Sequence, residues 1–67
     1  MENRIREFRA KHGLTQNDLA REVMVSRQTI QHIESGSTIP SLAHAAAIAM
    51  VLKTTVDELF LLSPEGR

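Results

Sequence analysis

The stretch LTQNDLAREVMVSRQTIQHIESG, residues 14–36, decides the fold. It contains the same helix-start signal twice, first at Thr15, where an acidic residue three positions on completes a capping-box pattern, and again at Ser26. Apolar residues directly before each cap and four positions after it are typical of a hydrophobic staple. These signals predict helices over 15–23 and 26–35, joined so tightly that they must cross steeply, as in a helix-turn-helix.

Three further helices are expected around this pair. The charged, amphipathic start of the chain predicts a helix over 2–12. Pro40 followed by Ser41 marks the start of a helix over 41–52, and the cap pattern at Thr55 marks one over 55–62. No segment shows the strict alternation of a strand. The sequence therefore predicts an all-α fold, a compact five-helix domain over residues 1–67.

Glycines and apolar spacing support these boundaries. Gly13 and Gly36 follow the first and third helices, where a left-handed residue commonly ends a helix. Apolar residues fall at spacings of three and four within each helix, which gives each helix one buried face. The expected core is Ile5, Phe8, Leu19, Ala20, Val23, Ile30, Ile33, Leu42, Ala45, Ile48, Ala49, Leu52, Val56, Leu59 and Phe60.

Composition narrows the class of protein. The 67 residues carry 8 basic and 8 acidic side chains, and no cysteine is present, which excludes disulfides and thiolate metal sites. Residues 1–32 hold six basic and four acidic side chains (+2), and residues 33–67 hold two and four (−2). The chain starts with charged residues rather than a signal peptide, and no apolar stretch reaches membrane-spanning length. We expect a cytoplasmic protein that neither enters a membrane nor needs a cofactor.

The outward face of the 26–35 helix carries the functional signal. At about 100° per residue, the buried face contains Ile30 and Ile33. The opposite side carries long side chains with several hydrogen-bond donors. Arginine can bond a guanine and glutamine an adenine in the major groove of DNA. The expected base contacts are Arg27, Gln28, Gln31 and His32; the alternative is an ordinary solvated face.

Phosphate contacts are expected at both ends of the helix pair. Gln16 lies in the first turn of its helix, where free N–H groups and the positive end of the helix dipole attract phosphate. Its alternative role is that of a neutral residue at a helix start. The loop after the 26–35 helix offers hydroxyls and backbone amides that we expect to be free. The full set is Thr15, Gln16, Ser26, Ser35, Ser37 and Thr38.

Five segments together resemble the Xre/Cro/C1 family of helix-turn-helix regulators, whose domain is of the lambda-repressor-like type: LTQNDLA (14–20), VSRQTI (25–30), IESG (33–36), IPSL (39–42) and VDELF (56–60). The resemblance covers nearly the whole chain. It implies a sequence-specific, double-stranded DNA-binding transcriptional regulator, a repressor in our interpretation.

The resemblance also assigns roles to individual residues. It implies that Gln16 contacts phosphate, and that Arg27, Gln28 and His32 act mainly in the groove. It further implies that Arg9 and Glu34 form a structural ion pair between the first and third helices.

Three positions depart from the family pattern. Met24 and Lys53 stand where the family usually has glycine, and Thr54 stands where it has an apolar residue before the last helix. A left-handed conformation at the first two positions would cost on the order of 1 kcal/mol each.

The 41–52 helix has more apolar residues than one buried face can use. Such a surplus is often a protein interface, and a two-fold dimer would present two recognition helices about 34 Å apart. The expected interface is Ala43, Ala47, Met50, Val51, Leu61 and Leu62. Alternatively, the alanines serve helix propensity and the leucines cover the core.

Two other classes of function are alternatives to a DNA-binding homodimer. The first is an antitoxin or adaptor that binds another protein through the last two helices. The second, an enzyme, lacks support in the sequence. His12, His32 and His44 are on separate expected helices, and we find neither a P-loop nor the spacing of a metal site.

Overall fold

The computed structural model describes residues 2–60, and these form five helices and no strand beyond one isolated bridge. The prediction of an all-α, five-helix fold is confirmed. None of the helices in residues 2–60 is long and apolar enough to cross a membrane. The helices are α1 (Ile5–Lys11), α2 (Gln16–Val23), α3 (Arg27–Ser35), α4 (Leu42–Val51) and α5 (Val56–Leu59).

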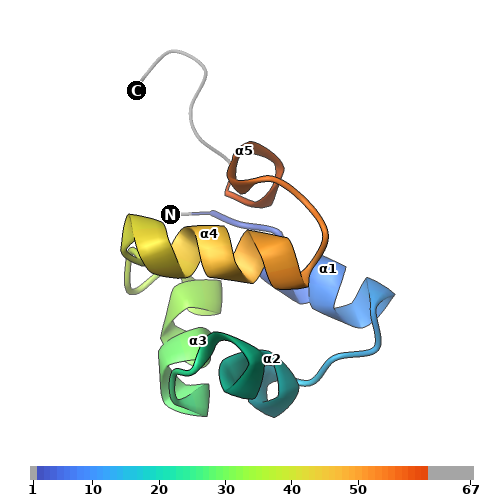
Figure 1. Cartoon of the computed structure of the whole chain (residues 1–67). Helices are drawn as coiled ribbons and strands as arrows, with labels where there is room; N and C mark the ends of the chain where they lie inside the picture. The colour runs from blue at the N-terminus through green and yellow to red at the C-terminus, as the bar shows by residue number, and fades with distance from the viewer. Residues whose placement is uncertain (1, 61–67) are drawn as a thin grey trace.

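Helices α2 and α3 pack directly on each other, and α4 runs across the molecule with the pair on one side of it (Figure 1). Helix α5 lies close to the N-terminal segment, on the other side of α4 (Figure 1). A single apolar cluster fills the space between the helices, and partly buried residues such as Leu14 and Val25 pack against it. The buried residues are Ile5, Phe8, Leu19, Ala20, Val23, Ile30, Ile33, Ala45, Ile48, Ala49, Leu52, Leu59 and Phe60.

The caps predicted at four helix starts are present. Thr15 Oγ1 accepts a hydrogen bond from the Asp18 N–H at 3.0 Å, and the Asp18 carboxylate accepts one from the Thr15 N–H, which completes the capping box. The hydroxyls of Ser26, Ser41 and Thr55 each accept from the N–H three residues on, at 3.1–3.2 Å. Each cap satisfies a donor that the helix leaves unpaired.

Left-handed residues lie at the predicted helix ends. Gly13 and Gly36 have φ of 69° and 84°, and the two departures from the family's glycines, Met24 and Lys53, have φ of 61° and 57°. The chain therefore keeps the left-handed geometry at both positions without glycine.

The predicted start of the first helix was wrong. Residues 2–4 are not helical, because this segment pairs with the far end of the domain. Asn3 forms an antiparallel bridge with Phe60, and the Arg4 N–H donates to the Leu59 carbonyl at 2.7 Å. The Asn3 carboxamide also donates to the Ile33 carbonyl at 2.9 Å. These partners lie too far along the chain for a local pattern to reveal them.

Three other expectations need correction. Helix α5 ends at Leu59 rather than at residue 62, because Phe60 turns into the extended bridge with Asn3. Leu42, expected in the core, is 80% exposed in the first turn of α4. Val56 is half-buried and packs against the edge of the cluster.

Candidate nucleic-acid interface

Helix α3 displays its polar side chains on one exposed surface. Ile30 and Ile33 are buried in the core, which fixes the rotation of the helix about its axis. The four residues expected to contact bases, Arg27, Gln28, Gln31 and His32, are all exposed. Helix α3 thus presents one arginine, two glutamines and one histidine to solvent, a set of donors and acceptors that suits base edges in a major groove.

Arg9 and Glu34 form an ion pair that joins α1 to α3. Arg9 Nε lies 2.5 Å from Glu34 Oε2, and Nη2 donates to the other carboxylate oxygen at 3.2 Å. Arg9 Nη1 also donates to the Leu14 carbonyl at 2.8 Å. The side chains are 14% and 9% exposed, so this bidentate pair is largely shielded from water. The pair holds the C-terminal end of α3 against α1.

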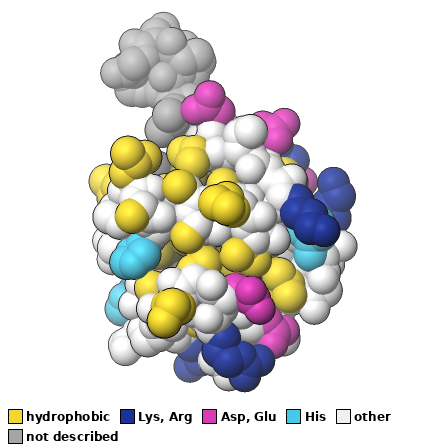
Figure 2. Space-filling view, in the orientation of Figure 1, with side chains coloured by type: hydrophobic (Ala, Val, Ile, Leu, Met, Phe, Trp, Pro, Cys, Tyr) yellow, Lys and Arg dark blue, Asp and Glu magenta, His cyan; other side chains and the backbone are white. Residues whose placement is uncertain are grey.

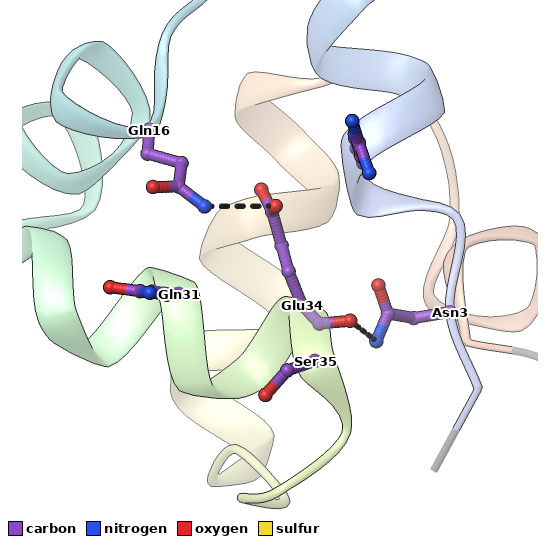
Figure 3. Close-up of a pocket in the computed structure, with 6 residues that line it drawn as sticks. Asn3, Gln16, Gln31, Glu34 and Ser35 are labelled. Carbon is purple, nitrogen blue, oxygen red and sulfur yellow. Dashed lines mark hydrogen bonds between the residues drawn. The ribbon is translucent and has the colours of Figure 1, made fainter.

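Gln16 is placed by the same carboxylate. Its Nε2 donates to Glu34 Oε1 at 3.2 Å, and Figure 3 shows the two side chains pointing toward each other from α2 and α3. Its Oε1 accepts from Arg27 Nη1 at 3.4 Å. A continuous set of hydrogen bonds therefore runs from Arg9 through Glu34 and Gln16 to Arg27, at the edge of the exposed face of α3.

The hydroxyls expected to meet phosphate already have partners within the protein. Thr15 and Ser26 cap α2 and α3, as described above. Ser26 Oγ also lies 2.9 Å from Thr29 Oγ1. A capping hydroxyl accepts one bond through a lone pair and can still donate its proton. The hydroxyls of Thr15 and Ser26 can therefore cap their helices and still donate a hydrogen bond to another group.

The loop after α3 does not offer free amides, contrary to our expectation. The N–H of Ser37 donates to the His32 carbonyl at 3.0 Å, and that of Thr38 donates to the same oxygen at 3.3 Å. The Ser35 and Ser37 hydroxyls also bond this carbonyl, and they lie 2.5 Å from each other. The loop satisfies carbonyls at the end of α3, which is the usual need at a helix C-terminus.

A pocket of about 320 Å³ lies between the start of the chain, α1, α2 and α3. Asn3, Gln31, Glu34 and Ser35 line it together with Gln16 (Figure 3) and with Arg6 of α1. No local pattern in the sequence marks Asn3 or Arg6 as site residues. The position of Asn3 depends on bonds to residues about thirty positions away, which leave no local signal.

The four described residues of the expected dimer interface are not equivalent. Met50 is 78% exposed and Ala43 is also exposed, whereas Ala47 and Val51 are half-buried against the core. Apolar side chains gather on the face of the molecule that Figure 2 shows, over α4. Leu61 and Leu62 lie outside the described residues.

A family model and the sequence relatives agree on the family. The family model described as helix-turn-helix matches residues 5–59. An uncharacterized HTH-type transcriptional regulator of Archaeoglobus fulgidus is 48% identical over 65 residues, which is 97% of this chain and 93% of the relative. The HTH-type transcriptional regulator YgzD of Bacillus subtilis is 37% identical over 66 residues, 98% of this chain and all of the relative.

A solved structure shares the fold. A chain of the SinR protein/SinI protein complex superposes with a TM-score of 0.80 at 26% identity. The match covers 96% of this chain and 63% of that chain. With the family model spanning α1 to α5 and relatives matching nearly end to end, the chain belongs to the Xre/Cro/C1-type helix-turn-helix family of DNA-binding transcriptional regulators.

Proposed function

We propose that this protein is a cytoplasmic repressor that reads a specific sequence of double-stranded DNA with α3 in the major groove. The observation that carries the proposal is the exposed face of α3, where Arg27, Gln28, Gln31 and His32 lie beside one another opposite two buried isoleucines. These side chains offer the hydrogen-bond donors and acceptors that distinguish base pairs in the major groove. Repression would follow from occupying an operator.

Phosphate contacts are proposed to hold α3 in register. Gln16, Thr15 and Ser26 lie at the N-terminal ends of α2 and α3, where helix dipoles favour an anion. Gln16 would exchange its bond with the carboxylate of Glu34 for a bond with a phosphate oxygen, or share its two N–H groups between them. Ser35, Ser37 and Thr38 are weaker candidates, because the hydroxyls of the two serines are already turned toward the end of α3.

The test begins with selection of bound sequences from a random pool of duplexes. Replacing Gln28 and His32 together with alanine should then weaken operator binding by about 30-fold or more, since each base contact contributes about 1–3 kcal/mol of discrimination. Non-specific binding should change little. His44→Ala, which removes an exposed histidine from α4, is the matched control. Unchanged selectivity in the double variant would remove α3 from the assignment.

We further propose that the working unit is a homodimer that meets through α4. Met50 and Ala43 are exposed on this helix, and Leu42 extends the apolar surface at its start. Met50→Glu should yield monomers by light scattering. Met24→Glu is the control, because Met24 is 90% exposed on the α2–α3 turn, away from α4. A dimer that survives Met50→Glu would contradict the model.

A second candidate is a protein-interaction module that binds a different protein through the same surface. The neighbour in the SinR protein/SinI protein complex favours it, since that fold occurs there with a protein partner. The two proposals differ in one measurement. A protein that shows no salt-dependent binding to any duplex at low ionic strength would support the interaction module and overturn the DNA-binding proposal.

A further inference from the structure

Arg6 differs from the other arginines of the described chain in having no partner. Within residues 2–60, Arg4 pairs with Glu7, Arg9 with Glu34 and Arg21 with Asp18, and Arg27 bonds Gln16. Arg6 makes no hydrogen bond or ion pair to any of these residues, and it is exposed on α1. An arginine kept free of carboxylates is available to a ligand from outside the chain.

Arg6 also lines the pocket that borders the proposed reading face. Gln31 and Ser35, one helical turn apart on α3, line the pocket on one side, and Asn3 lines it on the side formed by the start of the chain. Gln31 is exposed on the same helix face that carries Gln28 and His32. A ligand bonded to Arg6 and Gln31 would therefore lie directly beside the groove that α3 occupies.

The charge balance of the pocket selects an anion. Glu34 is the acidic residue of its lining, but its carboxylate accepts two bonds from Arg9 and one from Gln16 and its side chain is only 9% exposed. The charges of Glu34 and Arg9 cancel, which leaves Arg6 as the uncompensated charge. The guanidinium and the Gln31 amide together offer several donors, which is the chemistry that a phosphodiester accepts.

We propose that Arg6 binds a backbone phosphate of the DNA strand that runs along the edge of the groove read by α3, and that the Gln31 amide shares its two N–H donors between this phosphate and the base edge. This inference rests on the proposed function and extends its contact surface from the helix-turn-helix to α1. The contact positions the protein on the duplex without reading its sequence. It also helps to explain how a chain with no net charge attracts a polyanion, since one unpaired cation lies where the strand passes.

The first experiment measures affinity for a labelled duplex of mixed sequence against salt. Arg6→Gln should make the negative slope of log K against log[salt] less steep by about 0.9 for each bound chain. The loss of affinity between 50 and 200 mM salt should then be smaller by about 3.5-fold for each bound chain. Arg6→Lys should restore most of the slope. Lys53→Gln is the matched control, because it also removes one exposed positive charge. Lys53 follows α4, next to Leu52, whose carbonyl bonds His12 at the C-terminal end of α1, so this variant should leave the slope unchanged.

The second experiment locates the phosphate. Single methylphosphonates are placed in turn along the selected operator, and affinities are compared for the unaltered protein and Arg6→Gln. One position in each half-site should weaken the unaltered protein and have no effect on the variant. If the unaltered protein binds with a steep salt dependence but Arg6→Gln has the same slope and no position couples to it, the inference is overturned while the proposed function stands. If the unaltered protein binds no duplex, both are overturned.

Discussion

Helices α3 and α4 are similar in length, nine and ten residues, yet they divide polar and apolar residues in opposite ways. Helix α3 buries two isoleucines and exposes glutamines, an arginine and a histidine. Helix α4 buries Ala45, Ile48 and Ala49, yet it also exposes Leu42 and Met50. Polar side chains on the exposed side of α3 are stable in water whether or not DNA is bound. Solvation does not explain large apolar side chains left in water on α4, which is why we propose a partner for that face.

The two helices also differ in what holds them. Helix α3 is fixed by apolar contacts and by the shielded charges of Arg9 and Glu34 near its C-terminal end. The buried side of α4 is apolar throughout, with Ser41 capping its start. Removing a charge should therefore weaken α3 but not α4, whereas α4 should respond only to changes in buried volume.

Breaking the ion pair should have the largest effect. Glu34→Ala leaves the Arg9 guanidinium shielded and without its carboxylate, so the free energy of unfolding should fall by about 3–5 kcal/mol. Urea denaturation followed by circular dichroism measures it. The double variant Arg9→Met, Glu34→Leu, which removes both charges, should recover most of the loss. A loss below about 1 kcal/mol for Glu34→Ala would mean that water reaches the pair and that α3 is held by apolar contacts alone.

Removing one methyl group from the buried side of α4 should have a smaller effect. Ile48 is fully buried, and Ile48→Val should lower the free energy of unfolding by about 0.5–1.5 kcal/mol. The same urea titration measures it. Met50→Ala, on the exposed side of the same helix, should change the monomer's stability by less than about 0.5 kcal/mol. Equal losses at the two positions would show that the surface of Met50 is covered in solution.

Short-range signals in the sequence were sufficient for most helix starts. The caps at Thr15, Ser26, Ser41 and Thr55 act within four residues, so the local pattern contains all the groups involved. The rotation of α3 was equally local, because the spacing of Ile30 and Ile33 fixes its buried side.

Features that depend on distant partners were missed. Asn3 is held by Phe60 and by carbonyls of α3, so a helical pattern over residues 2–12 gave no sign that its start would be extended. Leu42 lies on an apolar helix whose buried side depends on where the neighbouring helices pack, which periodicity cannot show. The unpaired state of Arg6 likewise becomes visible only when the partners of the other arginines are known.

The turn before α3 and the turn after α4 each contain a left-handed residue that is not glycine, and replacing it should have a smaller effect on stability. Met24 precedes α3 and has φ of 61°, a left-handed conformation that costs a non-glycine residue about 1–2 kcal/mol. Met24→Gly relieves this strain but gives the unfolded chain more freedom, so the net gain should be about 0.5–1 kcal/mol, seen as a higher Tm. Met24→Ala keeps the strain and should show no gain. Lys53→Gly, after α4, should gain by a similar amount, because its φ is 57°. A higher Tm for only one of the two glycine variants would show that the left-handed conformation costs little stability at the other position.

The smallest expected effect concerns acid, which should act on the cap of α2 and not on that of α4. The hydrogen bond from the Thr15 N–H, with help from the Thr15 hydroxyl, lowers the pKa of Asp18 below its ordinary value of 3.8. Because the folded-state pKa is lowered, the contribution of Asp18 to stability is present above about pH 3.8 and is lost as pH falls through the folded-state pKa. A carboxyl-carbon NMR titration should place the pKa below 3.8, and Thr15→Ala should move it upward. Ser41, which caps α4, carries no group that titrates in this range. A pKa for Asp18 at or above 3.8 would contradict the capping box and remove this difference between the two caps.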